Sequence, residues 1–260
     1  METANELFLA SFEGDYDDES AWNAVRSLRQ RSTEEVFQLA VAYCRSDSPK
    51  RRARALDGLA QLGAGKQLSE RPHFSESVAI ALAHLHDEDP LVVYSAVWAL
   101  AHLNDSRAVA ALIEMRKHPD PDIRHAVACG MANSDRPEAI STLIELMEDE
   151  NDEVRNWSTF QPAHSYVEDG PERPGSLTSS EIRDAFRRRL NDSFAEVREE
   201  AIWGLALRKN PMGLKLLLER LDCEQHSPGD AMTAAEIFDL GYDTPVEELR
   251  IGLRCLLNAL

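Results

Sequence analysis

The fold is decided by the stretch DEDPLVVYSAVWAL, residues 87–100, because three later segments repeat its pattern. The copies are HPDPDIRHAVACGM at 118–131, DENDEVRNWSTF at 149–160 and DSFAEVREEAIWGL at 192–205. In each copy an aliphatic anchor residue follows a polar turn, and successive anchors are 31, 31 and 43 residues apart. A period of this length is typical of proteins that repeat one supersecondary unit along the chain. The anchors are Val92, Ile123, Val154 and Val197.

Each copy also has the periodicity of an amphipathic helix. In the first copy, Ala96 and Leu100 lie four and eight residues after Val92, and the last copy has the same residue types there. Residues spaced by four share one helix face, so the spacing predicts a buried stripe. A second apolar stripe at 107–115 recurs 31 residues later at 138–146. Each repeat is therefore predicted to be a helical hairpin.

This pattern resembles the HEAT-like repeat family, in particular the short bacterial repeats related to phycobilisome lyases. The shared features are an acidic residue, a Val/Ile-Arg pair, and small or apolar residues four and eight positions later. The resemblance implies that the Asp caps its helix and contacts a neighbouring Arg, which forms a ladder of ion pairs. His118 replaces the Asp in one repeat and Val93 replaces the Arg in another, so we expect interruptions there. The ladder positions are Asp87, Asp149 and Asp192, and Arg52, Arg124, Arg155 and Arg198.

The predicted architecture is all-α: an α-solenoid of about six HEAT-like helical hairpin repeats in one domain, residues 1–260. Capping helices occupy 1–46, core repeats 47–222, and a C-terminal capping repeat 223–260. We expect the second helix of each repeat to line the concave face. Its acidic residues there would be Glu114, Glu145 and Glu219.

Two irregular segments lengthen the period. A weaker copy has Arg51 in the anchor position, 41 residues before Val92, and the excess falls near residues 63–74. The second interruption is the Pro- and Gly-rich segment 161–178, a predicted loop insertion in which Pro162 should end the preceding helix. The loop either contributes to a binding site or is a neutral surface insertion. The candidate partner-binding residues around it are Trp157, Phe160, His164, Tyr166, Glu168 and Asp169.

The charge balance limits the possible partners. The chain has 28 basic and 46 acidic residues, which gives a net charge of −18 and a pI near 4.8. Such acidity disfavours nucleic acid and anionic membrane surfaces, whereas it favours a basic protein partner. Glu148, Glu150 and Glu153 belong to an acidic run at a helix start, where carboxylates also suit the helix dipole. Because such runs recur at one end of successive repeats, we predict an acidic docking strip.

The sequence gives no sign of a leader or a membrane span. Its first residues lack a basic region, and no stretch reaches the roughly 20 apolar residues that a bilayer requires. The four cysteines are far apart, which predicts free, buried thiols in a reducing cytoplasm of bacterial type. We also expect a monomer. The cysteines are Cys44, Cys129, Cys223 and Cys255.

Catalytic signatures are lacking in the sequence. It contains no phosphate-binding loop, dinucleotide fingerprint, nucleophile elbow or zinc-protease motif. His84, His102 and Asp87 could in principle trap a metal, but solvated or capping histidines explain them better. Trp98 and Trp203 share one repeat position, six residues after the anchor, and are expected to pack between repeats.

The predicted function is a non-enzymatic HEAT-repeat scaffold that binds a protein partner, for example as an immunity or escort protein for a basic protein. No catalytic residue, metal or cofactor is predicted. The alternatives are a phycobilin-lyase-like enzyme and a DNA-repair glycosylase-like HEAT protein. A lyase would carry a coloured tetrapyrrole, and a glycosylase would need a basic concave face, which the net charge of −18 disfavours.

Overall fold

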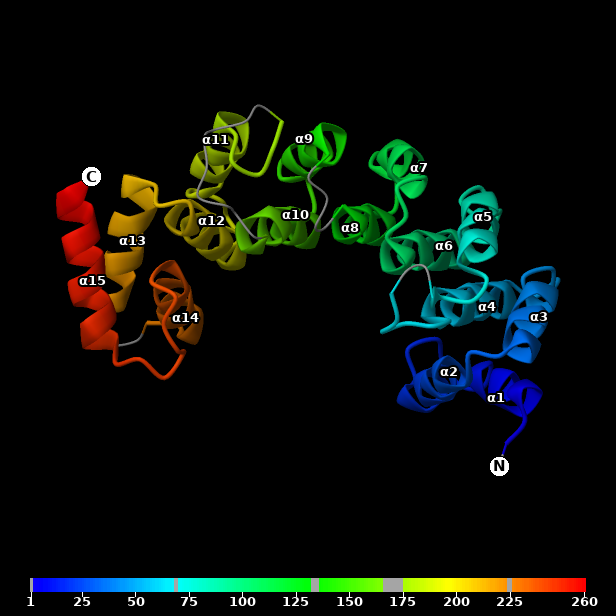
Figure 1. Cartoon of the computed structure of the whole chain (residues 1–260). Helices are drawn as coiled ribbons and strands as arrows, with labels where there is room; N and C mark the ends of the chain where they lie inside the picture. The colour runs from blue at the N-terminus through cyan, green and yellow to red at the C-terminus, as the bar shows by residue number, and fades with distance from the viewer. Residues whose placement is uncertain (1, 68–69, 132–135, 166–174, 224–225) are drawn as a thin grey trace. The chain divides into compact units, whose positions relative to one another are not determined.

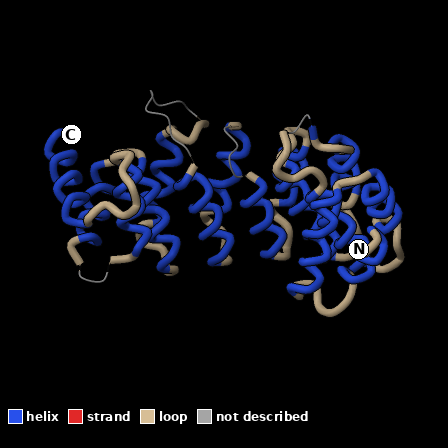
Figure 2. Tube along the Cα trace, turned by 60° about the horizontal axis from the view of Figure 1, so that its bottom comes forward, coloured by secondary structure: helices blue, strands red, loops and turns tan. Residues whose placement is uncertain are grey.

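The computed structural model describes residues 2–67, 70–131, 136–165, 175–223 and 226–260. Within these ranges the chain forms fifteen α-helices and no β-strand, as the ribbon and tube views show (Figures 1 and 2). This confirms the prediction of an all-α repeat fold. The helices group into two compact units, Met1–Gly130 and Met131–Leu260, here called the N-terminal and C-terminal units.

The N-terminal unit contains three complete helical hairpins, preceded by a short helix and followed by a single one. Its helices are α1 (Ala4–Ser11), α2 (Glu19–Arg31), α3 (Glu34–Tyr43), α4 (Pro49–Gln61), α5 (Phe74–Ala83), α6 (Pro90–Leu103), α7 (Ala108–Met115) and α8 (Pro121–Gly130). The sequence pattern did not predict α1. It starts with a capping box formed by Thr3 and Glu6, and it buries Leu7 and Phe8.

The C-terminal unit begins with a single helix and continues with three hairpins. Its helices are α9 (Pro137–Leu146), α10 (Asp152–His164), α11 (Ser180–Arg189), α12 (Ala195–Leu207), α13 (Pro211–Leu221), α14 (Pro228–Ile237) and α15 (Val246–Ala259). Both predicted flanking pairs are therefore helical: α2 with α3 and α14 with α15.

Helix starts follow the capping rules. Asp89, Asn151, Ser179 and Asn210 each accept a hydrogen bond from a backbone N–H in the first turn of the following helix. Several helices also have Pro at their first position, where the missing N–H would have no helical partner in any case. These local signals fix where each hairpin turns, so the repeat register follows directly from the sequence.

Within each unit the first helices of successive repeats form one row and the second helices another (Figure 1). In the N-terminal unit, α2, α4, α6 and α8 lie on the inner side of the unit's curve, and α4 packs most extensively against α6. The expectation that second helices line the concave face is therefore wrong for this unit. The reason is side-chain size: α4 and α6 bury many alanines, which bring their backbones close together. The first helices consequently occupy the tighter, inner row.

Pro162 does not end α10, which continues to His164. The side chain of Arg208, on the turn after α12, compensates for the disrupted end of the helix. Its guanidinium donates to the carbonyls of Pro162 and Ala163 at 2.5 and 3.4 Å, and to those of Gly204 and Leu177 at 2.9 Å. These carbonyls have no helical donors because α10 ends at His164, and the Arg208 side chain satisfies them.

The cysteines are less buried than expected. Cys44 is buried, and burial raises the pKa of its thiol to about 12. Cys129 is half-buried, whereas Cys223 and Cys255 are exposed. Cys223 lies just beyond α13 and Cys255 lies on α15.

Candidate functional site

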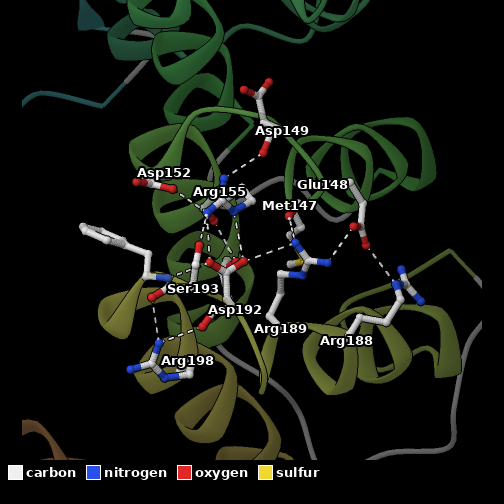
Figure 3. Close-up of polar contacts among 12 residues, drawn as sticks. Met147, Glu148, Asp149, Asp152, Arg155, Arg188, Arg189, Asp192, Ser193 and Arg198 are labelled. Carbon is white, nitrogen blue, oxygen red and sulfur yellow. Dashed lines mark hydrogen bonds and ion pairs between the residues drawn. The ribbon is translucent and has the colours of Figure 1, made fainter.

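An ion-pair ladder connects successive first helices. In the C-terminal unit, Arg155 of α10 donates from Nε and Nη2 to the two carboxylate oxygens of Asp192, each at 2.9 Å (Figure 3). In the N-terminal unit, Arg52 of α4 makes the same bidentate contact with Asp87, at 2.9 and 2.7 Å. Each rung thus joins the Arg of one repeat to the Asp before the next first helix. Such paired, directional contacts set repeat register.

The family resemblance implied that the ladder Asp caps its helix, but the Asp does not cap it directly. Asp87 and Asp192 instead accept from the backbone N–H two residues later, at 3.0 Å, which fixes the turn before the helix. The geometry also reinterprets the two departures. Because each rung runs from one repeat to the next, Val93 and His118 are the two ends of the same rung. The two departures therefore remove a single rung of the ladder and do not interrupt two separate repeats.

The predicted acidic strip has one strongly paired member. Glu148 accepts from Arg188 Nε at 2.9 Å and from Arg189 Nη2 at 2.6 Å, both on α11 (Figure 3). Glu153, in the first turn of α10, is exposed, and so is Glu150 in the turn before it. The Arg run of α11 thus partly neutralises the acidic start of α10.

Three of the predicted partner-binding residues form one aromatic group on α10. The ring centroids of Trp157 and Phe160 are 5.4 Å apart, and those of Phe160 and His164 are 4.7 Å apart. His164 continues the row to Trp203 of α12, at 5.9 Å. All four side chains are at least partly exposed, and they form a continuous aromatic row across two first helices. We name it the aromatic row.

Carboxylates contact His164 and Trp203 at one end of the aromatic row. Glu200 Oε2 lies 2.8 Å from His164 Nε2. Trp203 donates from Nε1 to Asp230 at 2.9 Å, and Arg220 donates to the same carboxylate at 2.7 Å. Asp230 is fully buried and also forms the capping box of α14 with Ser227. Trp203 is therefore fixed between repeats, as expected from its repeat position, and His164 is held by Glu200 of the next first helix.

Tyr166, Glu168 and Asp169, the remaining predicted binding residues, lie outside the described residues. The predicted loop insertion at 161–178 is therefore described only at its two ends. The first end is the last turn of α10. The second is the turn at 175–179, where Gly175 has a positive φ of 69° and lies against Pro137.

A second site, in the N-terminal unit, was missed by sequence reasoning. A pocket of about 200 Å³ lies among α2, α4 and α6 and the connection before α2. Its walls include the rings of Trp22, Tyr94 and Trp98, and its floor includes the carboxylate of Asp57. Asp57 is only 6% exposed and stands six residues after Arg51, the position that carries Trp98, Phe160 and Trp203 in other repeats. A charged residue in an aromatic repeat position was the signal available in the sequence.

Hydrogen bonds fix this carboxylate. Tyr16 donates to Asp57 Oδ2 at 2.6 Å, and the fully buried Arg54 donates to the same oxygen at 3.1 Å. The Arg54 guanidinium also lies 4.0 Å from the ring centre of Tyr16 and 4.6 Å from that of Trp22. Burial raises the pKa of Asp57 to about 6, although hydrogen bonds from Tyr16 and the charge of Arg54 oppose the rise. The group is thus mainly ionised at neutral pH.

No arrangement for metal binding is seen in the parts of the chain that the structure describes: none of their His, Cys, Asp and Glu clusters could hold an ion. The ring nitrogens of His84 lie 2.8 and 3.0 Å from the carbonyl oxygens of Ile80 and Cys44. His102 Nδ1 lies 2.9 Å from the carbonyl oxygen of Trp98. Asp87 is held by Arg52, so these side chains have structural partners.

Comparison with known proteins places the chain in a fold class. Residues 78–160 match the family model for HEAT repeats. None of the curated protein sequences matches the chain. The crystal structure of the Escherichia coli protein YibA is similar over 100% of this chain and 93% of that one, at 22% identity and a TM-score of 0.71. Residues 78–160 are therefore similar to HEAT repeats, and the whole chain shares the all-α solenoid fold that the sequence predicted.

Two further structures share the fold. A designed armadillo repeat protein in complex with the peptide (KR)4 has a TM-score of 0.52 at 16% identity, over 79% of this chain and 99% of that one. The CpcE–CpcF complex of phycocyanin lyase from Nostoc has a TM-score of 0.53 at 16% identity, over 86% of this chain and 94% of that chain. At such identities the likeness concerns the fold alone. Among the described helices, none is long and apolar enough to cross a membrane.

Proposed function

We propose that the protein is a non-enzymatic HEAT-repeat scaffold that binds a basic protein partner along its first helices. The observation that carries the proposal is the aromatic row of the C-terminal unit, in which Trp157, Phe160 and His164 project from one helix face without being buried. Partly exposed aromatic side chains are the residue type that most often anchors protein interfaces.

The charge of the chain supports a basic partner. The net charge is −18, and the exposed Glu150 and Glu153 open the helix that carries the aromatic row. Aromatic faces and carboxylates together attract cationic side chains. The designed armadillo protein that shares this fold binds a peptide of alternating Lys and Arg, so a helical-repeat surface can accommodate such a chain.

A stoichiometric escort or immunity role would suit such a scaffold, because it requires tight neutralisation of a basic protein and no chemistry. The proposal includes a cytoplasmic location and a monomeric scaffold. The fold likeness to phycocyanin lyase supports an enzyme as the second candidate. A lyase-like protein purified from its native cells would carry visible tetrapyrrole absorbance, and a glycosylase-like protein would be retained on DNA at low salt.

The test is fluorescence anisotropy with a labelled peptide of alternating Lys and Arg and with a Glu-rich peptide of equal length. We expect saturable binding of the basic peptide only, weakening as salt rises. The double variant Trp157→Ala/Phe160→Ala should lose at least tenfold in affinity. Glu150→Lys/Glu153→Lys should lower both the affinity and its salt dependence. Glu148 is left unchanged because its loss would remove a carboxylate that pairs with Arg188 and Arg189.

The matched control is Glu114→Lys/Glu181→Lys, which makes the same charge change on the second helices α7 and α11, where both residues are exposed. It should reduce affinity by less than threefold, through net charge alone. Equal losses from both charge-reversed pairs would show attraction without a defined surface. Absence of basic-peptide binding by the unaltered protein would refute the basic-partner proposal.

A further inference from the structure

We propose that the pocket among α2, α4 and α6 of the N-terminal unit receives one basic side chain, a Lys ammonium or an Arg guanidinium, of a bound protein. This deepens the proposed function and rests on it for the identity of the partner. The pocket itself can be tested without any partner, because its chemistry defines the ligand: an organic cation on an alkyl stem.

The pocket walls are suited to a cation. Trp22 comes from α2, and Tyr94 and Trp98 come from α6, with ring centroids of the latter two 6.2 Å apart at an interplanar angle of 71°. Aromatic faces carry negative electrostatic potential, and rings that meet at a steep angle can surround a positive group. The alkyl stem of a Lys or Arg side chain would lie against the same rings.

The floor of the pocket supplies a carboxylate oxygen that is not already occupied. Tyr16 and Arg54 both donate to Oδ2 of Asp57, and within the described residues no hydrogen bond reaches Oδ1. Asp57 is more than nine-tenths buried, yet it lines the pocket. Oδ1 is not one of the fully buried atoms that lack a partner, so it is accessible from the pocket, and a cation there would pair with it. Asp57 thus serves as the recognition group.

The surrounding charges also favour a cation. Asp17 lines the pocket and is exposed. Burial raises the pKa of the Tyr94 hydroxyl, and the negative charges of Asp122, Asp17 and Asp57 raise it further. Neither Lys nor Arg is among the lining residues of the pocket, and the nearby Arg54 is fully buried and paired with Asp57. Negative charge therefore exceeds fixed positive charge around the pocket, so an anionic ligand would be disfavoured relative to a cation.

The size of the pocket selects a side chain over a large ligand. A pocket of about 200 Å³ is smaller than the roughly 300–1,000 Å³ typical of cofactor and drug sites. It is therefore too small to enclose a tetrapyrrole, and it matches the bulk of one long basic side chain.

The test uses N-acetyl-lysinamide and N-acetyl-argininamide as probes, followed by the indole N–H signals of the ¹⁵N-labelled protein in NMR. The chain has four tryptophans, so its two pocket tryptophans and the two of the C-terminal unit report separately. We expect the Trp22 and Trp98 signals to shift saturably, and at lower probe concentrations than those of Trp157 and Trp203. The neutral analogue, in which the Lys ammonium is acetylated, should cause no saturable shift.

Two variants separate recognition from folding. Asp57→Asn should weaken probe binding at least tenfold, but it also leaves Arg54 without its carboxylate. Trp98→Leu keeps that ion pair and should weaken binding by at least fivefold. Trp203→Phe, in the other unit, is the matched control and should leave the Trp22 and Trp98 shifts unchanged. Circular dichroism and thermal melting establish that each variant is folded.

The outcomes distinguish the pocket from the scaffold proposal. If the basic peptide binds through Trp157 and Phe160 but neither probe shifts Trp22 or Trp98, the pocket inference is wrong and the scaffold proposal stands. If the probes bind in an Asp57-dependent manner but no basic peptide binds, the pocket is established and the partner class is wrong. Equal shifts by the cationic and the neutral probes would also overturn the pocket inference, because charge would play no part.

Discussion

Two buried aspartates show how one residue type acquires opposite properties within a single repeat fold. Burial alone would raise the pKa of Asp192, but hydrogen bonds from Arg155 and the backbone, together with the charge of Arg155, hold it below the usual value. Asp57 also pairs with an arginine, but its deeper burial dominates, and its pKa rises to about 6. Asp192 therefore stabilises the ladder in its charged form, whereas charging Asp57 opposes folding.

The ladder contact should have a large effect on stability. Arg155 and Asp192 have side chains that are only 9% and 4% exposed, so Asp192→Asn leaves the buried guanidinium with only the more exposed Asp152 as counter-charge. We expect a loss of about 3 kcal/mol in the free energy of unfolding, measured by urea denaturation at neutral pH. Because the folded pKa of Asp192 is lowered, this contribution is present above the unfolded pKa and disappears as the pH falls through the folded value.

The control for this prediction is Glu148→Gln, which breaks an ion pair with Arg188 and Arg189 at a side chain that is 46% exposed. Such a pair contributes at most about 1 kcal/mol. Similar small losses from both variants would contradict a structural role for the ladder.

Asp57 should give the opposite pH dependence. Its folded pKa of about 6 exceeds the ordinary Asp value of 3.8, so its favourable contribution is complete below 3.8 and is lost as the pH rises through about 6. The shift of about two pKa units corresponds to roughly 3 kcal/mol. Unfolding free energies of the native protein and of Asp57→Asn, measured between about pH 4 and pH 7.5, should diverge by this amount.

The change with pH isolates the titration of Asp57, because the unpaired Arg54 of the variant adds an offset that does not vary over this range. Parallel curves for the two proteins would show that Asp57 keeps an ordinary pKa. The same titration affects the pocket, whose affinity for a cation should fall as the pH drops below about 6, since the neutral carboxyl attracts it less.

At the scale of helices, periodic features could be predicted from the sequence, and departures from the period could not. Apolar spacing and capping residues located the hairpins from α2 onward. The end of α10 was mispredicted because Arg208, more than forty residues after Pro162, donates to its carbonyls. The aromatic residues of α10 were candidates because they adjoin the predicted loop at 161–178, whereas their contact with one another was not predicted. The Asp57 site was not predicted, because it depends on Tyr16 and Ser95, which meet from positions 79 residues apart.

The packing of α12 against α13 depends on a close approach at Gly213. A Cβ atom added there would lie 2.5 Å from the Leu205 side chain and 2.6 Å from the backbone nitrogen of Ala206. Gly213→Ala should improve helix propensity by up to about 1 kcal/mol, but the backbone of α12 cannot move aside locally. We expect a net destabilisation of about 1–3 kcal/mol, measured by urea denaturation.

Gly58 provides the matched control in α4. Its added Cβ would meet the Phe8 ring at 3.3 Å, and a ring can shift by the few tenths of an ångström required. Gly58→Ala should therefore be neutral or slightly stabilising. Stabilisation by both substitutions would mean that helix propensity outweighs packing at the α12–α13 contact.

At the scale of the whole molecule, stability in a repeat protein is a sum of local terms, because each repeat contacts mainly its neighbours. The sequence predicted the array but not its division into units at Gly130, since the repeat pattern runs across that point without a change. Sequence periodicity reports what successive repeats share, whereas the division reflects how densely particular side chains pack. A local defect should therefore lower stability mainly within its own unit.

Asp230 allows this expectation to be tested. It is fully buried and accepts from Trp203 of α12, Arg220 of α13 and the backbone of Ser227 at the start of α14, so three helices depend on it. In Asp230→Asn, hydrogen exchange measured by mass spectrometry should accelerate at least tenfold in α12, α13 and α14. Exchange in α1 to α8 should be unchanged, since none of their repeats contacts the defect.

Tyr16→Phe is the converse variant, because it removes hydrogen bonds to Asp57 and Ser95 within the N-terminal unit alone. It should accelerate exchange in α2, α4 and α6 and leave the C-terminal unit unchanged. The two variants together determine the size of the cooperative unit. If either substitution accelerated exchange evenly along the whole chain, the molecule would open as a single cooperative structure, and the nearest-neighbour description of its stability would be wrong.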